Sequence, residues 1–227
     1  MLKIVRTTAI SVLLCTLVAC NTTQSSSDST SNKKDATALI NTQLGLSYLE
    51  KHEVQQAKQK LLLALDEAPN IPETWYSMAY FMEVTGNKTE AEKYYLKAIE
   101  IAPKKGEVQN NYGTFLCRTG DYSGAINHFL LAVQDPKYLD TASAYENAGL
   151  CAMKIPDAKL AMQYFNEAIT QDPNHPTSLF ELARFNYLQG NYAQAKEELH
   201  QFLVLSPPTP QSQWLSEKIA EKMRGTV

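Results

Sequence analysis

The residues of this sequence that could perform covalent or metal chemistry are its cysteines and histidines, four of each among 227 residues. No two cysteines have the CxxC spacing of a zinc or dithiol site, and no histidine stands at metal spacing from a second ligand. These residues are Cys15, Cys20, Cys117, Cys151, His52, His128, His175 and His200. The sequence therefore predicts no bound metal ion and no cofactor.

Motifs of catalysis are missing as well, because the GxSxG, HExxH, GxGxxG and Walker A patterns do not occur. Acidic residues are common, but most fall at expected helix-surface positions, such as Glu90 and Glu197, which are typical of a solvated face. The net charge of -3 argues against nucleic acid as a partner. We expect no enzyme, no small-molecule substrate and no nucleic acid; catalysis by dispersed groups is the alternative.

The N-terminus has the composition of a bacterial export signal. Two basic residues precede an apolar run, Ala9 to Ala19, which is too short to span a bilayer as a helix. The run ends in Leu17-Val18-Ala19-Cys20, which resembles a lipobox, the motif at which a lipoprotein precursor is cleaved before a lipidated cysteine. We predict a signal peptide over residues 1–19 and a lipid anchor, such as palmitate, on Cys20. A secretory signal that is cleaved elsewhere is the alternative.

The residues after Cys20 predict where the chain is held. Asn21 resembles the sorting signal of lipoproteins that go to the outer membrane, where the protein would face the periplasm. Residues 21–35 contain no aliphatic or aromatic side chain, so they cannot bury a core. We therefore expect residues 20–37 to form a lipidated, flexible tether.

From residue 38 onward the sequence repeats with a period near 34. Small residues recur at the eighth position of each repeat, where two helices can approach closely; they are Gly45, Ala79, Gly113, Gly149 and Ala183. Proline recurs near the end of each repeat, where it ends the second helix. This pattern is the tetratricopeptide repeat, and it predicts an all-α superhelix. The five predicted repeats are 38–71, 72–105, 106–141, 142–175 and 176–209.

A final amphipathic stretch over residues 210–227 predicts a C-terminal capping helix. Trp214, Leu215 and Ile219 are expected to cover the apolar face that the last repeat leaves exposed.

Two cysteines remain for the folded part of the chain. Cys117 and Cys151 fall on the first helices of the third and fourth repeats, and such helices pack side by side. Because an exported protein meets an oxidising compartment, we predict a disulfide between them. Two buried free thiols are the alternative.

Tetratricopeptide arrays bind partners in the groove that their first helices line. Aromatic side chains beside amides and arginine suit the recognition of a peptide, because rings give contact area and amides pair with its backbone. The first repeat instead offers Leu39, Leu46 and Leu49, as an apolar docking patch or as packing against the tether. The predicted partner-binding residues are Tyr76, Tyr80, Asn110, Asn111, Thr114, Glu146, Asn147, Leu150, Phe180, Arg184 and Tyr187.

Two segments resemble one family. Residues 110–117 read NNYGTFLC and residues 144–151 read AYENAGLC, and both resemble the PilF/PilW family of type IV pilus biogenesis lipoproteins. The resemblance covers the lipobox and essentially the whole chain that follows it, except that only one helix stands where some members have a sixth repeat. It implies a pilotin, an outer-membrane lipoprotein that helps secretin subunits reach that membrane and multimerise, or a protein that stabilises pili. It also singles out Asn110, Asn111, Tyr112, Glu146 and Asn147 as the partner surface. Tyr112 is the seventh residue of its repeat, a position that large core residues fill, so its ring is expected in the core.

One other function stays open from the sequence. A tetratricopeptide lipoprotein of β-barrel assembly, or an adaptor for cell-wall hydrolases, would also carry an anchor and repeats. That function does not explain the two segments that resemble PilF and PilW.

Overall fold

The computed structural model describes residues 25–225, so the predicted signal peptide and the predicted lipidation of Cys20 lie outside the described residues. Within this range the chain forms helices and no strand, which confirms the predicted all-α class. The helices are α1 (Ser25–Glu50), α2 (Val54–Glu67), α3 (Pro72–Val84), α4 (Lys88–Ile101), α5 (Gly106–Thr119), α6 (Tyr122–Ala132), α7 (Thr141–Ala152), α8 (Ala158–Gln171), α9 (Pro176–Leu188), α10 (Tyr192–Leu205) and α11 (Pro210–Arg224).

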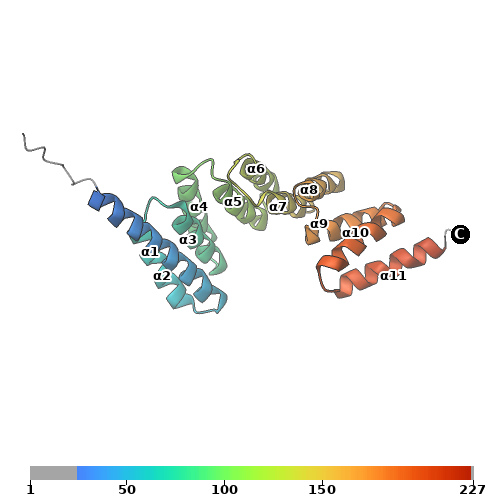
Figure 1. The fold of residues 1–227 in the computed structure, drawn as a ribbon, viewed down its shortest axis with the longest axis horizontal. Coiled ribbons are helices and arrows are strands. Elements are labelled where there is room, and N and C mark those ends of the chain that lie inside the picture. Colours follow the sequence, from blue (N-terminus) through green and yellow to red (C-terminus); the bar gives the residue numbers. More distant parts are fainter. Residues whose placement is uncertain (1–24, 226–227) are drawn as a thin grey trace, which may run out of the picture.

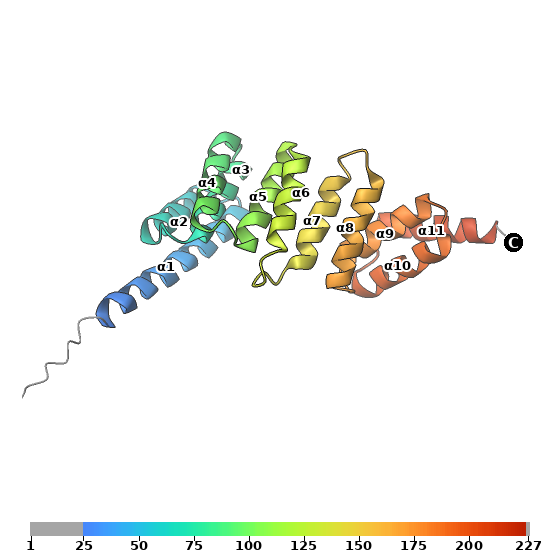
Figure 2. The ribbon, with the colours of Figure 1, turned by 90° about the horizontal axis from the view of Figure 1, so that it is seen from above.

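The helices form an extended array of pairs. Each odd-numbered helix packs against the even-numbered helix that follows it, and successive pairs also contact each other. The pairs follow one another along the long axis, from α1 and α2 in blue and cyan to α9 and α10 in orange, and the single helix α11 in red ends the array (Figures 1 and 2). The chain is therefore a solenoid, in which each predicted repeat contributes one helix pair.

The small residues at the eighth position of each repeat let the two helices of a pair approach closely. A Cβ atom at Gly149 would lie 2.7 Å from a ring carbon of Phe165, and one at Gly113 would lie 2.9 Å from a ring carbon of Phe129. Both rings are fully buried. Turns between paired helices use a left-handed glycine at Gly86, Gly120 and Gly190, where φ is 89°, 101° and 83°. The turn between α1 and α2 uses His52 instead, with φ of 61°.

The two extra residues between the third and fourth repeats form an ordered loop. Asp135 accepts hydrogen bonds from the backbone N–H groups of Gly106, at 2.8 Å, and Lys137, at 2.9 Å. Tyr138 is buried against Gly106, whereas the next residue, Leu139, is 95% exposed. The insertion therefore packs between the third and fourth repeats through Tyr138 and leaves the Leu139 side chain in solvent.

The N-terminal boundary corrects the predicted tether, because α1 is helical from Ser25 rather than from residue 38. The packed part of α1 buries Ala38 beside Ala64 and Ala68, and Asn41 donates to Glu67 at 2.9 Å. Once that part is fixed, each further helical residue adds a hydrogen bond without a new nucleation cost. The lack of apolar side chains therefore did not prevent helix formation.

The C-terminal helix corrects one capping residue. Leu215 and Ile219 are buried against α9 and α10, as the sequence predicted. Trp214 is 53% exposed and covers the last repeat only in part, where its ring lies edge-on to that of Tyr187 on α9. Adjacent residues on a helix point about 100° apart, so Leu215 and Trp214 do not share a face.

Candidate partner-binding groove

The predicted partner-binding residues all lie on first helices of the repeats, and the structure divides them into two groups. One group follows α3, α5 and α7 in the middle of the solenoid. The other lies on α9, next to α11, and comprises Phe180, Arg184 and Tyr187. The middle group comprises Tyr76, Tyr80, Asn110, Asn111, Thr114, Glu146, Asn147 and Leu150.

An arginine that the repeat positions did not predict joins α3 to α5. Arg118 donates from Nε and Nη2 to the two carboxylate oxygens of Glu83, at 2.6 Å and 2.8 Å. Its guanidinium carbon lies 5.9 Å from the centre of the Tyr80 ring. Tyr95 donates its hydroxyl proton to Glu83 as well, and burial together with the Glu83 charge raises the pKa of this phenol. The buried carboxylate thus holds the arginine against the aromatic ring.

Two asparagines join α5 to α7. Asn147 donates from its side-chain amide to the amide oxygen of Asn110 at 3.1 Å. Asn111 donates to the backbone oxygen of Glu107 at 2.7 Å, and Thr114 donates to the backbone oxygen of Asn110 at 2.9 Å. Tyr112 is buried in the main core, as its position in the repeat predicted. The two segments that resemble PilF and PilW are therefore joined by an amide pair, and also by the disulfide between Cys117 and Cys151.

A carboxylate and an imidazole join α7 to the start of α9. Glu146 Oε2 lies 2.9 Å from Nδ1 of His175, the residue before the first turn of α9. Burial raises the pKa of Glu146, while His175 and a hydrogen bond from Thr177 lower it. His175 was missed from the sequence because it stands just before α9, 29 residues after Glu146, and meets this carboxylate only when α9 packs beside α7. We call the cross-helix pairs Glu83–Arg118, Asn110–Asn147 and Glu146–His175 the central ladder.

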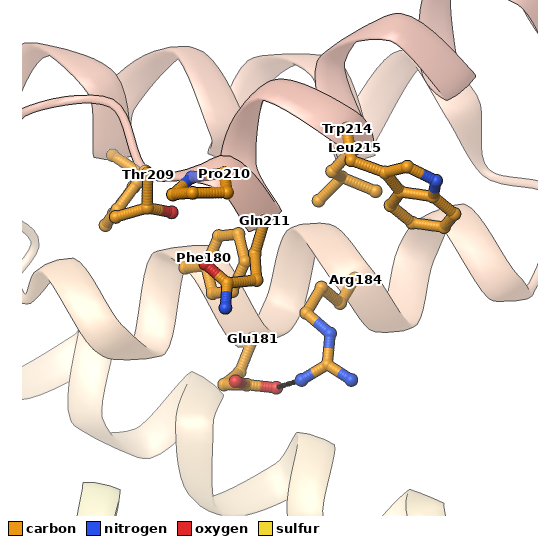
Figure 3. Close-up of a pocket in the computed structure, with 9 residues that line it drawn as sticks. Phe180, Glu181, Arg184, Thr209, Pro210, Gln211, Trp214 and Leu215 are labelled. Atoms are coloured by element: carbon orange, nitrogen blue, oxygen red, sulfur yellow. Dashed lines mark hydrogen bonds and ion pairs between the residues drawn. The ribbon is translucent and has the colours of Figure 1, made fainter.

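The C-terminal end of the solenoid differs from its middle, because residues of α9, α10 and α11 line a cavity of about 770 Å³ there. Figure 3 shows Phe180, Glu181 and Arg184 on one side and Gln211, Trp214 and Leu215 on the other. The Phe180 ring packs on Phe202, with ring centres 5.1 Å apart. Tyr187 lies edge-on to Trp214, with ring centres 6.1 Å apart. We call this site the C-terminal cavity.

Trp214 was not among the predicted partner-binding residues, although its position within α11 matches that of a predicted residue within α9. Counted from Pro210, the first residue of α11, Trp214 is the fifth residue. Phe180 is likewise the fifth residue counted from Pro176 at the start of α9. Treating α11 as the first helix of a further repeat would have placed Trp214 in the groove.

The two internal cysteines lie beside the central ladder. Cys117 of α5 and Cys151 of α7 form a disulfide in the structure, with Cα atoms 5.8 Å apart. Both cysteines belong to or pack on the main core, so the bridge joins two first helices from within.

Among residues 25–225, no three His, Cys, Asp or Glu side chains converge in a way that could hold a metal ion. In the same range, no helix is both long enough and apolar enough to span a bilayer.

Sequence comparisons identify the repeat. Profiles of the tetratricopeptide repeat match residues 72–105, 113–176 and 157–211. The type IV pilus assembly protein PilF of Pseudomonas aeruginosa is 30% identical over 155 residues. That match covers 68% of this chain, and the chain spans 62% of the length of that relative.

Solved structures agree with the sequence match. The structure of Pseudomonas aeruginosa PilF aligns with a TM-score of 0.77 at 26% identity and covers 86% of this chain and 87% of that chain. The structure of PilW, described as a widely conserved type IV pilus biogenesis factor, aligns with a TM-score of 0.70 at 27% identity. It covers 82% of this chain and 86% of its own.

Proposed function

The chain belongs to the tetratricopeptide-repeat family, in a PilF/PilW-like group, and from this premise we propose that it functions in type IV pilus biogenesis. Its role there is that of a pilotin, which binds secretin subunits and promotes their localisation and multimerisation at the outer membrane. Stabilisation of assembled pili is the other role within the same process. Neither role requires catalysis.

The observation that carries this proposal is the meeting of the two PilF/PilW-like segments in the groove. Residues 110–117 and 144–151 lie on adjacent first helices and contact each other through Asn110 and Asn147. Amide side chains there are half-buried, so they have fixed positions and can still pair with the backbone of a bound segment. The secretin subunit is the proposed partner.

A deletion strain tests the function. Loss of secretin multimers together with loss of pili supports the pilotin role. Normal multimers with few or unstable pili support the pilus-stabilising role. Normal pili with defective barrel insertion would contradict both and indicate the scaffold function in β-barrel assembly. Complementation should fail with Asn110→Ala/Asn147→Ala and succeed with Leu96→Ala, a matched control at an exposed side chain on α4.

The proposed membrane anchor has its own test. We propose that a lipid on Cys20 holds the protein on the periplasmic face of the outer membrane, since multiple acyl chains give stable anchoring. Cys20→Ala should move the protein out of the outer-membrane fraction. If the variant stays in that fraction, the anchor proposal is wrong.

A further inference from the structure

The C-terminal cavity combines an exposed indole with a buried apolar floor. Trp214 is 53% exposed, whereas Leu215 beside it is 1% exposed and Phe202 is buried. A large aromatic side chain that is left half in water beside a concave apolar site is typical of a recognition surface. The volume of about 770 Å³ lies within the range of about 300–1,000 Å³ of ligand pockets.

Arg184 and Glu181 form an ion pair at the edge of this cavity, and Arg184 is the more exposed of the two. Arg184 donates from Nη1 to Glu181 at 2.6 Å. The Arg184 side chain is 44% exposed and the Glu181 side chain is 11% exposed. Since an arginine carries five N–H donors, the outward part of the guanidinium can still pair with an incoming carboxylate. Glu181 is the one acidic residue among the described residues that line the cavity.

From this geometry we propose that the C-terminal cavity binds an acidic peptide segment of a partner protein. A large apolar side chain of the segment packs between Phe180 and Trp214, and a nearby carboxylate of the segment pairs with Arg184. The proposal rests on the proposed pilus function only for the identity of the protein that supplies the segment. A protruding side chain suits this site because the site is concave, whereas a second folded copy would need about 800 Å² of matching surface per partner.

Four synthetic peptides test the chemistry without reference to any secretin. They share a Gly-Ser-Asn background and carry Phe or Ser at one position and Glu or Lys three residues later. Binding to the folded chain is measured by Trp fluorescence and NMR titration. The Phe/Glu peptide should bind roughly tenfold more tightly than the Ser/Glu or Phe/Lys peptide, because an anchor group typically contributes more than a tenfold factor.

Variants of the protein complete a double-mutant cycle. Arg184→Gln should remove the preference for Glu over Lys, and Trp214→Ala, followed by NMR, should remove the preference for Phe over Ser. Leu96→Ala, the exposed control on α4, should leave both preferences unchanged. Circular dichroism melting shows whether each variant is folded.

Several results would overturn the proposal. Equal binding of all four peptides would contradict it, and so would an Arg184→Gln variant that still prefers Glu. Self-association that Trp214→Ala abolishes would show that a second copy occupies the cavity instead. If the peptide preferences hold but no overlapping peptide of the secretin binds, then the docking chemistry stands and the proposed pilotin function fails.

Discussion

The central ladder and the C-terminal cavity both involve first helices of the repeats, yet their side chains are used differently. In the middle of the solenoid, each first helix has another on both sides, and its polar groups pair across helices, as in Glu83–Arg118 and Glu146–His175. At the C-terminal end, Arg184 pairs with Glu181 on its own helix, and Trp214 is left half-exposed.

In the interior of the array, polar side chains of the first helices therefore pair with the neighbouring first helix. At the end of the array, such pairing is confined to one helix. Interior groove residues hold the repeats in register, which gives a partner a preorganised polar surface. At the C-terminal end, the α9–α10 pair is followed by the single helix α11, and the Trp214 side chain of α11 is half-exposed. The buried core follows the same division, because residues of α10 and α11 form a second cluster with Leu179 and Ala183 of α9, whereas Leu182 of α9 belongs to the central cluster.

The largest expected effect compares one buried ring with one exposed ring. Phe165 in α8 is fully buried, so Phe165→Ala should lower the free energy of unfolding by about 3–5 kcal/mol. Trp214→Ala should lower it by at most about 1 kcal/mol, because half of the indole is already in water. Urea unfolding checks both. Equal losses would contradict the division between a structural centre and a binding end.

The next effect concerns the bridge between α5 and α7. The disulfide joins Cys117 and Cys151, which are 34 residues apart in sequence. Its loss should lower the free energy of unfolding by about 3–4 kcal/mol. Thermal melting with and without reductant measures this, with Cys117→Ala/Cys151→Ala as the variant that should not respond. Full thiol labelling of both cysteines in the unreduced mature chain would show that the bridge does not form.

A smaller effect separates the two arginines. Arg118→Gln should cost about 1 kcal/mol, since it leaves the Glu83 carboxylate, whose side chain is 10% exposed, without its bidentate partner. Arg184→Gln should cost about 0.5 kcal/mol or less, because it breaks an exposed pair within one helix. Chemical denaturation of the two variants compares them. A larger loss for Arg184→Gln would reverse their proposed roles.

The smallest effect is a pH dependence. Burial raises the pKa of Glu146 above 4.5, so the folded chain holds a proton that the unfolded chain has already lost. The stability from this group is therefore present below about pH 4.5 and falls as pH rises through the raised pKa. Glu146→Gln should flatten the profile of unfolding free energy in that window. If the unfolding free energy of Glu146→Gln depends on pH as steeply as that of the unmodified chain, the Glu146–His175 pair does not cause this pH dependence.

Much of the fold was predictable because the repeat period is a local signal. Alanine and glycine at fixed positions and proline near each repeat end predicted the helix pairs. Partners one repeat away were not predicted, since Arg118 meets Glu83 only when two helices are packed. The helical start of α1 at Ser25 was also missed, because composition alone does not show that a packed helix extends backward.

The candidate site shows the same limit. The repeat positions predicted Phe180 and Arg184, and the structure places both at the C-terminal cavity. Trp214 was assigned to the cap, because an amphipathic pattern does not define which of two adjacent apolar residues turns inward. That choice depends on how α11 packs against α9 and α10.

Photo-crosslinking tests most directly the central claim that a partner is bound by the first helices and anchored at the C-terminal cavity. A photoreactive phenylalanine replaces Trp214 in one variant and the exposed Leu96 of α4 or Leu131 of α6 in two others. Each variant is irradiated with the secretin in cells. We expect a crosslink to the secretin from position 214 and none from positions 96 and 131. Crosslinks from the second helices, with none from position 214, would contradict it.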